Sequence, residues 1–210
     1  IGATMAGPLS AEDVVAASLK GIAAAQKQYE KMSDEWLWCA PEYFSTVFVA
    51  REIDKISSPK YITLENSAAA AIEDAGAKGR GKLHSSIRAN GRFDILLWWS
   101  NGTPRAPIEV KCQVLDYKKI KSDVERIAKV VHRNKKKSSI GFGAVVFYAS
   151  CKNDKTFSAK EKLTKSLDNI LQEAKTNVGT SCALSLSQSR IKVVDSSAWV
   201  AAVLLLKPKN

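Results

Sequence analysis

Two runs of the sequence, Arg92-Phe-Asp-Ile-Leu-Leu-Trp-Trp99 and Pro107-Ile-Glu-Val-Lys-Cys-Gln-Val114, flank the dipeptide Asn101-Gly102. Both runs are rich in strand-forming residues, and Asn-Gly between such runs is the strongest short signal for a β-hairpin. The sequence therefore predicts strands over Arg92 to Trp99 and Ala106 to Leu115, with Asn101 and Gly102 as the central pair of the turn.

Polar and apolar residues alternate along the second strand. Glu109, Lys111 and Gln113 are separated by apolar residues, so they are predicted to share one face while the apolar side chains enter the core. With Asn101-Gly102 at the centre of the turn, residues whose numbers sum to 203 face each other, which sets Asp94 opposite Glu109. Directly opposed residues have Cβ atoms about 4.5–5.5 Å apart. Two carboxylates are thus expected to meet beside Lys111.

A positive group is expected between these two acids, because like charges at this distance destabilise a sheet. Carboxylate oxygens, a backbone carbonyl and waters suit Mg²⁺ or Mn²⁺. Such an ion acidifies its bound water and screens the charge that develops on a phosphate, while Lys111 would orient the attacking water or stabilise that charge. The pattern predicts phosphodiester hydrolysis. A large separation of the two side chains, or an arginine buried against either acid, would contradict the hydrolase prediction.

The remaining sequence predicts further helices and strands. Helical periodicity and end signals indicate helices over Ala11 to Lys31, Pro41 to Ile56, Glu65 to Ala75, Lys118 to Lys137 and Ser158 to Lys175. Apolar runs indicate strands over Gly143 to Ala149, Ile191 to Val194 and Ala198 to Leu206. This order predicts a mixed α/β domain with a central sheet and helices around it.

Length and composition limit the number of domains and the class of protein. The chain has 210 residues, of which 45% are hydrophobic and 25% charged, as in a globular domain rather than a disordered or fibrous chain. Residues 1–7 are predicted to be a cloning remnant or a disordered N-terminus, 8–40 an N-terminal helical extension and 41–210 the main domain.

The apolar runs and the cysteines indicate the cellular compartment of the protein. The longest uninterrupted apolar stretch, Ala198 to Leu206, is too short to cross a bilayer, and no secretory signal pattern opens the chain. Four cysteines are scattered without a Cys-x-x-Cys pair, beside only two histidines. This pattern argues against a structural zinc site or a disulfide framework, and it predicts a cytoplasmic protein without a membrane partner.

The charge balance predicts a polyanionic partner. The formal net charge is +11, and Lys118 to Lys137 alone holds nine basic and two acidic residues. A localised positive field attracts nucleic acid, although a solvated basic helix is the alternative interpretation. Candidate contacts to the phosphate backbone are Lys82, Arg88, Arg92, Lys118, Lys119, Lys121, Arg126, Lys129 and Arg133.

Asp94 followed by Glu109-Val110-Lys111, on adjacent strands before a helix, resembles the site of the PD-(D/E)xK nuclease superfamily. The resemblance implies a restriction-endonuclease-like fold, whose core runs helix, three strands, helix, strand. It also implies that Asp94 and Glu109 ligate the metal, that Val110 contributes its carbonyl and that Lys111 is catalytic. The proline of the family motif is absent, since Phe93 precedes Asp94.

Two further residues are implied by the same resemblance. Members often add an acid from the first core helix; Glu42 and Glu52 both qualify, and the Pro-Glu-Tyr-Phe opening favours Glu42. Gln113 resembles a polar residue that some members place just after the lysine. Acid-x-Lys occurs three times in the chain, but only Glu109-Val-Lys111 has apolar flanks, a preceding turn and an opposed aspartate.

The leading prediction is therefore a Mg²⁺- or Mn²⁺-dependent nuclease, an endonuclease acting on DNA, with RNA as the other candidate polymer. Because many enzymes of this superfamily cut both strands as dimers, the resemblance also implies a homodimer or a partner subunit. The alternative is a non-catalytic nucleic-acid-binding module that keeps the nuclease fold. Salt-sensitive binding without metal-dependent turnover would distinguish that module.

Overall fold

The computed structural model describes residues 9–58, 60–78, 83–133 and 136–209, which form five α-helices and seven strands. The helices are α1 (Ala11–Ser33), α2 (Glu42–Asp54), α3 (Ala68–Asp74), α4 (Lys121–His132) and α5 (Ala159–Val178). The strands are β1 (Lys60–Ser67), β2 (Arg92–Trp99), β3 (Pro104–Lys111), β4 (Gly143–Lys152), β5 (Cys182–Gln188), β6 (Lys192–Val194) and β7 (Ser197–Pro208). The segment 1–7, predicted to be a remnant or disordered, lies outside the described residues.

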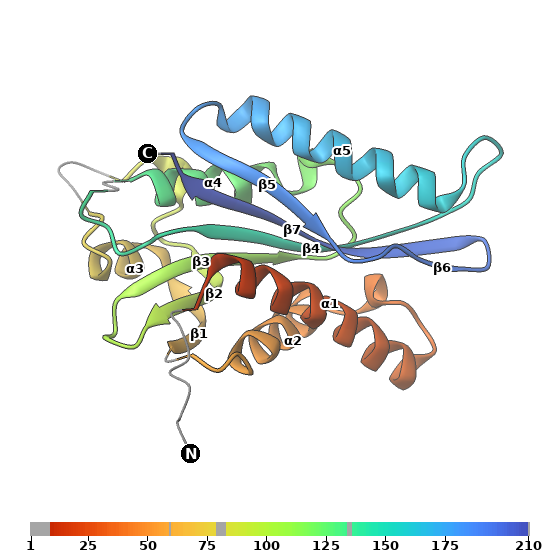
Figure 1. Cartoon of the computed structure of the whole chain (residues 1–210), viewed down its shortest axis with the longest axis horizontal. Coiled ribbons are helices and arrows are strands. Elements are labelled where there is room, and N and C mark those ends of the chain that lie inside the picture. The colour runs from red at the N-terminus through yellow and green to blue at the C-terminus, as the bar shows by residue number, and fades with distance from the viewer. Residues whose placement is uncertain (1–8, 59, 79–82, 134–135, 210) are drawn as a thin grey trace, which may run out of the picture.

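All the strands belong to one mixed sheet in the order β1-β2-β3-β4-β7-β5, with β6 paired to β7. β3 and β4 are parallel, and the other neighbouring pairs are antiparallel. Helices α1 and α2 cover one face, and α4 and α5 cover the other (Figure 1). The predicted α/β architecture, a central mixed sheet with flanking helices, is confirmed.

Alternation along the strands divides the apolar side chains between two cores. Ile108 and Val110 of β3 belong to the core under α1 and α2, whereas Leu96 of β2 and Phe147 of β4 belong to the core under α4 and α5. Glu109 is therefore directed toward the α4 side, as period-two alternation requires. The sheet is buried on both of its faces at this point, so a polar face on β3 is not a solvent-exposed face.

The β2–β3 hairpin keeps the predicted register for a reason that the sequence did not reveal. Ile95 pairs with Ile108 and Leu97 with Ala106, so the pairs sum to 203 as expected. The turn, however, is longer than predicted, because the Trp99 N–H donates to the Thr103 carbonyl at 2.9 Å. A bulge before Ala106 then restores the register, because the next pair is Trp98 with Pro104.

Several predicted elements differ in extent. The helix predicted over Glu65 to Ala75 is wrong at its start, because Lys60–Ser67 is a strand and the helix begins only at Ala68. Strand β5 was not predicted. The basic helix is shorter than Lys118 to Lys137: Tyr117–Lys119 form a separate 3₁₀ turn, and α4 ends at His132.

The predicted extension at residues 8–40 contains α1, which packs on α2 and the sheet. Ser10 caps α1 by accepting from the Asp13 N–H at 3.0 Å, and the Asp13 carboxylate accepts from the Ser10 N–H in return, which forms a capping box. Val14 and Ile22 are buried in the same core as Val110. Among the described residues, no helix combines the length and apolar character that spanning a bilayer requires.

Gly21 sets the distance between α1 and α2, so Gly21→Ala is expected to destabilise the protein. A Cβ at this position would lie 2.6 Å from the Val49 Cα. Overpacking against backbone costs about 1–3 kcal/mol, which outweighs the roughly 1 kcal/mol by which alanine exceeds glycine in a helix. Thermal and urea unfolding would measure the loss. A more stable variant would show that α1 does not dock this closely.

Candidate functional site

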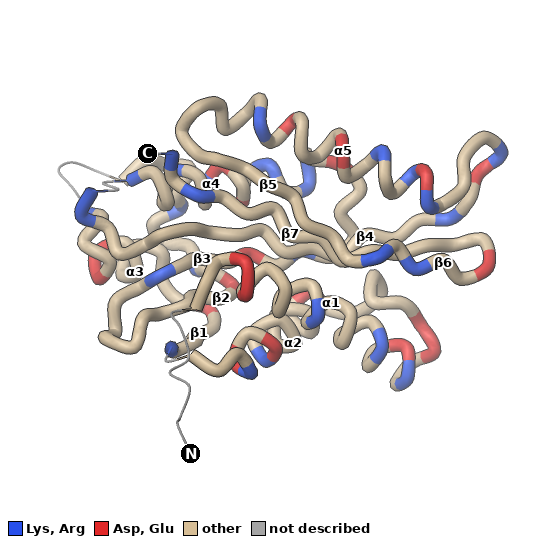
Figure 2. Tube along the Cα trace, in the orientation of Figure 1, with Lys and Arg blue, Asp and Glu red and all other residues tan. Residues whose placement is uncertain are grey.

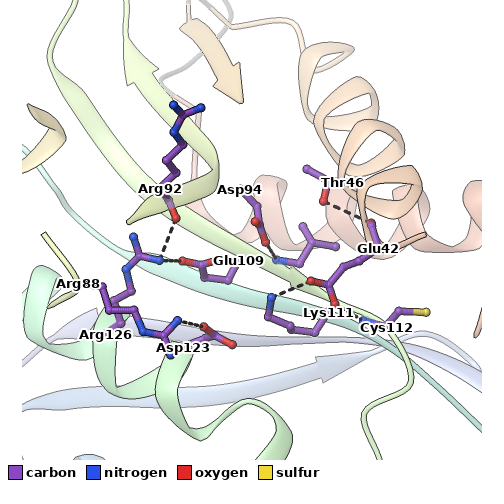
Figure 3. Close-up of polar contacts among 11 residues, drawn as sticks. Glu42, Thr46, Arg88, Arg92, Asp94, Glu109, Lys111, Cys112, Asp123 and Arg126 are labelled. Carbon is purple, nitrogen blue, oxygen red and sulfur yellow. Dashed lines mark hydrogen bonds and ion pairs between the residues drawn. The ribbon is translucent and has the colours of Figure 1, made fainter. Parts of the chain in front are cut away.

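Side chains from four elements meet where β2 and β3 lie beside the start of α4 (Figure 3). Asp94 comes from β2, and Glu109 and Lys111 come from β3. Glu42 is the first residue of α2, and Asp123 lies in the first turn of α4. The structure thus brings together the two opposed acids, the lysine and the helix acid that the sequence singled out.

Asp94 is held by the backbone of the neighbouring strand. Its Oδ2 accepts a hydrogen bond from the Val110 N–H at 2.7 Å. The contact fixes the carboxylate beside β3, next to Glu109 (Figure 3). Val110, expected to offer its carbonyl to a metal, is thus tied to Asp94 through its N–H. No hydrogen bond to the other Asp94 oxygen, Oδ1, is present within the described part of the chain.

Lys111 and Glu42 form an ion pair at the end of β3. Lys111 Nζ lies 2.8 Å from Glu42 Oε1, and Glu42 Oε2 accepts from the Cys112 N–H at 3.2 Å. Burial opposes the charge on Lys111, but the hydrogen bond and charge of Glu42 outweigh it and raise the pKa of the ammonium group. Glu52, the other helix acid considered, instead pairs with Lys55. Glu42 is therefore the acid that α2 contributes to the site.

Arg126 has a different position from the one predicted. It was expected to contact DNA at the surface, but it is buried, and its Nη1 lies 2.8 Å from Glu109 Oε1. The same guanidinium donates to the Ile87 and Arg92 carbonyls at 3.1 and 2.9 Å. The prediction that Arg126 contacts DNA at the surface is therefore wrong, because the apolar side of α4 directs this side chain toward the sheet. Glu109 is therefore buried against an arginine, the arrangement that contradicts the electrostatic argument for a hydrolase, so the charges of the two acids no longer require a metal.

Glu109 is 2% exposed and sits in an unfavourable electrostatic position. Burial and the charge of Asp94 raise its pKa to about 8, although Arg126 acts in the opposite direction. The 2.8 Å contact favours an ionised Glu109, but the surrounding acids and the loss of solvent favour a neutral one. Arg126 therefore compensates the negative charge of this cluster only in part.

Asp123 belongs to the cluster but was not identified from the sequence. It is buried, and its Oδ1 lies 3.8 Å from Arg88 Nη1. Burial raises the pKa of Asp123, while Lys111 and Arg88 lower it. The only signal in the sequence was its spacing from Arg126, three residues later on one face of a helix. Asp123 is one of only two acidic residues in a strongly basic segment, so the charge pattern did not single it out.

Gln113 lies outside the site. It was predicted to share the face of Glu109 and Lys111, but β3 ends at Lys111 and Gln113 has a φ of +57°. Its Oε1 accepts from the Ser150 hydroxyl at 2.9 Å, and its Nε2 donates to the Ser150 carbonyl at 2.9 Å. The catalytic role suggested for Gln113 is therefore not supported by its position. This amide fastens the end of β3 to β4.

We expect Gln113→Ala to lower stability and to leave any activity of the purified protein largely intact. The loss of its hydrogen bonds with Ser150 should cost about 1–3 kcal/mol, since the groups on β4 become partly unsatisfied. Urea unfolding would measure this loss beside an activity assay at a temperature where both proteins are folded. An activity loss of 100-fold in folded protein would restore Gln113 to the site.

The predicted phosphate contacts divide into two groups. Six are exposed, namely Arg88, Arg92, Lys118, Lys119, Lys121 and Lys129. Arg126 is buried, and Arg133 is half-buried with its Nε donating to the Ala77 and Lys78 carbonyls at 3.0 Å. Lys82 lies outside the described residues. The exposed set leaves α4 and the turn before it with a basic outer surface.

The fit of a divalent cation depends on the two acids. No three His, Cys, Asp or Glu side chains of the described residues are grouped to hold a metal. Magnesium, however, commonly uses one or two carboxylates and completes its shell with water and substrate phosphates. Asp94 Oδ1 and Glu109 Oε2 each lack a hydrogen bond from the described residues. The donors fit Mg²⁺ or Mn²⁺ in type, with Arg126 as a competing partner of Glu109.

Comparison with known proteins identifies no matching family model, no similar curated protein and no similar solved structure. The comparisons therefore do not identify the chain as a PD-(D/E)xK nuclease, and that resemblance stays a prediction. A functional assignment depends on the side chains described above and on the surface around them.

Proposed function

We propose that this protein is a Mg²⁺- or Mn²⁺-dependent nuclease that hydrolyses phosphodiester bonds in DNA as an endonuclease. The observation that carries the proposal is the meeting of Asp94, Glu109 and Lys111 on adjacent strands of a strongly basic protein, with Glu42 bound to the lysine. The element order α2, β1, β2, β3, α4, β4 also agrees with the restriction-endonuclease-like core, with α3 added after β1.

Each side chain has a distinct task in this proposal. Asp94 and Glu109 would hold the divalent cation, which when bound supplies an acidified water and screens charge on the phosphate. Lys111 lies beside the acids and would orient the attacking water or neutralise the charge that builds on the scissile phosphate. Glu42 keeps the Lys111 ammonium in place and protonated through the 2.8 Å ion pair. Glu42 is thus a positioning residue.

The surface charge supports a nucleic-acid substrate. The exposed basic residues before and along α4 lie close to the site, because Asp123 of the same helix is part of the cluster. Lysines that replace condensed cations on DNA supply affinity without reading sequence. Sequence specificity is therefore not expected from this surface, and RNA is the other polymer to be assayed.

The non-catalytic nucleic-acid-binding module is the second candidate, and Arg126 is the observation that favours it. An arginine buried against Glu109 supplies a positive charge that the two opposed acids require, so charge compensation alone does not demand a metal. In this interpretation Arg126 joins α4 to the segment before β2 and, through Glu109, to β3, and neither residue has a catalytic task. The same basic surface would then bind DNA without cutting it.

A cleavage assay distinguishes the two candidates. Purified protein would be incubated with supercoiled plasmid, linear duplex, single-stranded DNA and RNA in Mg²⁺, Mn²⁺ or EDTA. Metal-dependent cleavage supports the nuclease, and salt-sensitive binding without turnover supports the module. Plasmid that becomes linear without a nicked intermediate supports the proposed homodimer or partner subunit, because each site cuts one strand. Cleavage that persists in EDTA would overturn the metal requirement.

A further inference from the structure

A cavity remote from the acidic cluster is lined by three basic side chains and no acidic one. It has a volume of about 520 Å³ and lies between the first half of α5 and the segment that joins β5 to β6. Its cations are Lys160 of α5 and Arg190 and Lys192 of the joining segment and β6. Thr164, Gln188 and Ser189 add neutral polar groups to the wall.

These three cations are not neutralised by the protein. All three side chains belong to exposed residues, and none forms an ion pair with a carboxylate within the described residues. Glu161, the acid next to Lys160, accepts from the Ser158 N–H and hydroxyl in the capping box of α5. Cations gathered without counter-charges repel one another, so an anion bound among them is stabilised.

The lining is not a simple consequence of the overall charge of +11. A second cavity of similar size, about 530 Å³, is lined by Asp34, Glu35 and Asp195 and by one lysine, Lys152. Both cavities are lined in part by residues of β6. This strand lies at the end of the molecule where α1 ends and α5 begins (Figure 2). The lining of one cavity is therefore basic and that of its neighbour mainly acidic, which gives the anion a defined place.

The basic cavity also lies along α5 from the surface that is proposed to contact DNA. The Ser166 hydroxyl donates to the Leu115 carbonyl, which sets the turn containing Lys118 and Lys119 beside the middle of α5. Lys160 is six residues earlier on this helix, or about 9 Å along its axis. Because a helix turns by about 100° per residue, Lys160 and Thr164 lie on a different side of α5 from Ser166, so a nucleic-acid strand that contacts both the turn and the cavity must cross this helix.

We propose that the cavity formed by Lys160, Arg190 and Lys192 binds backbone phosphates of nucleic acid and extends the DNA-binding surface beyond α4. The proposal rests on the proposed nucleic-acid partner but not on cleavage. Three phosphate contacts make a measurable contribution, because each one steepens the dependence of log affinity on log salt by about 0.9 for duplex DNA.

The test compares two triple variants with the same change in net charge. Lys160→Gln, Arg190→Gln and Lys192→Gln remove the cations of the cavity. The matched control replaces Lys20, Lys27 and Lys31 by glutamine, which removes three exposed cations from α1 on the opposite sheet face. Fluorescence anisotropy with a labelled 30-base-pair duplex in EDTA, at several salt concentrations, gives the affinity and the salt slope.

The cavity variant is expected to bind at least about tenfold more weakly than the control, with a salt slope reduced by about 2–3. Circular dichroism should show both variants folded, since all the replaced side chains are exposed. Equal affinities in the two variants would overturn the inference and leave the proposed function standing. Wild-type protein that binds no nucleic acid would overturn both. Binding of tripolyphosphate at the cavity with unchanged DNA affinity would reassign it to a small anion and overturn the DNA contact.

Discussion

Asp94→Ala is expected to reduce Mg²⁺-dependent cleavage of DNA by about 100-fold or more. The substitution removes one of the two carboxylates that would hold the cation, and loss of one group that stabilises charge in a transition state, such as an oxyanion-hole donor, costs about 10²–10³ in rate. Lys111→Ala should have an effect of the same size, because its ammonium would orient the attacking water or neutralise the charge that builds on the phosphate. Initial rates of plasmid nicking would be measured under saturating DNA.

Two substitutions on α2 test whether the ion pair with Lys111 affects the rate, or whether loss of any acid on this helix does. Glu42→Gln removes the partner of Lys111 and is expected to lower the rate less than Lys111→Ala does, with a shifted pH profile. Glu52→Gln changes an acid on the same helix that pairs with Lys55 instead, and should leave the rate unchanged. Cleavage that continues unaltered in both Asp94→Ala and Lys111→Ala would show that the reaction occurs elsewhere.

Arg126→Met is expected to destabilise the protein by about 3–5 kcal/mol, which corresponds to a fall in Tm of roughly 6–20 °C. The substitution leaves Glu109 buried without its cation, and it frees the Ile87 and Arg92 carbonyls. Proton uptake by Glu109, whose pKa is already raised to about 8, should keep the loss near the lower limit. Urea and thermal unfolding at pH 7 would measure it.

The double variant Glu109→Gln with Arg126→Met provides the control. Replacing both members of a buried ion pair is often close to neutral, whereas removing one leaves an uncompensated charge. The double variant should therefore recover much of the stability lost in Arg126→Met. If both variants are equally unstable, the arginine acts through its carbonyl contacts, and its pairing with Glu109 is secondary. A stability close to wild type in Arg126→Met would show that neither the ion pair with Glu109 nor the hydrogen bonds to the two carbonyls stabilises the protein.

Much of the hairpin was predictable because its information is local. Alternating residues and a turn signal placed Asp94, Glu109 and Lys111 together, and Ile95 does pair with Ile108 in the predicted register. The prediction assumed a two-residue turn. The actual turn is longer, but the bulge offsets the additional residue, so the register is the predicted one. Gln113 was misplaced because a single left-handed residue ends the alternation, which a period-two pattern cannot indicate.

Elements with weak local signals were missed or misread. Lys60–Ser67 begins with the strand-forming residues Tyr61, Ile62 and Thr63, but its last three residues precede a run of alanines and were assigned to the helix, whereas pairing with β2 keeps them in the strand. Cys182–Gln188 alternates with serines and is likewise defined by its pairing with β7. In both segments the pairing with a neighbouring strand sets the extent of the strand.

The sequence by itself determined the basic charge, the α/β class and the facing acids of the hairpin, because each depends on composition or on neighbours along the chain. Only the tertiary structure decided which cation meets which acid. Glu42 reaches Lys111 from 69 residues away, and Arg126 turns inward from a helix whose lysines face out. The reason is that ion pairing depends on distance and on loss of solvent, and both are fixed only when the helices pack on the sheet.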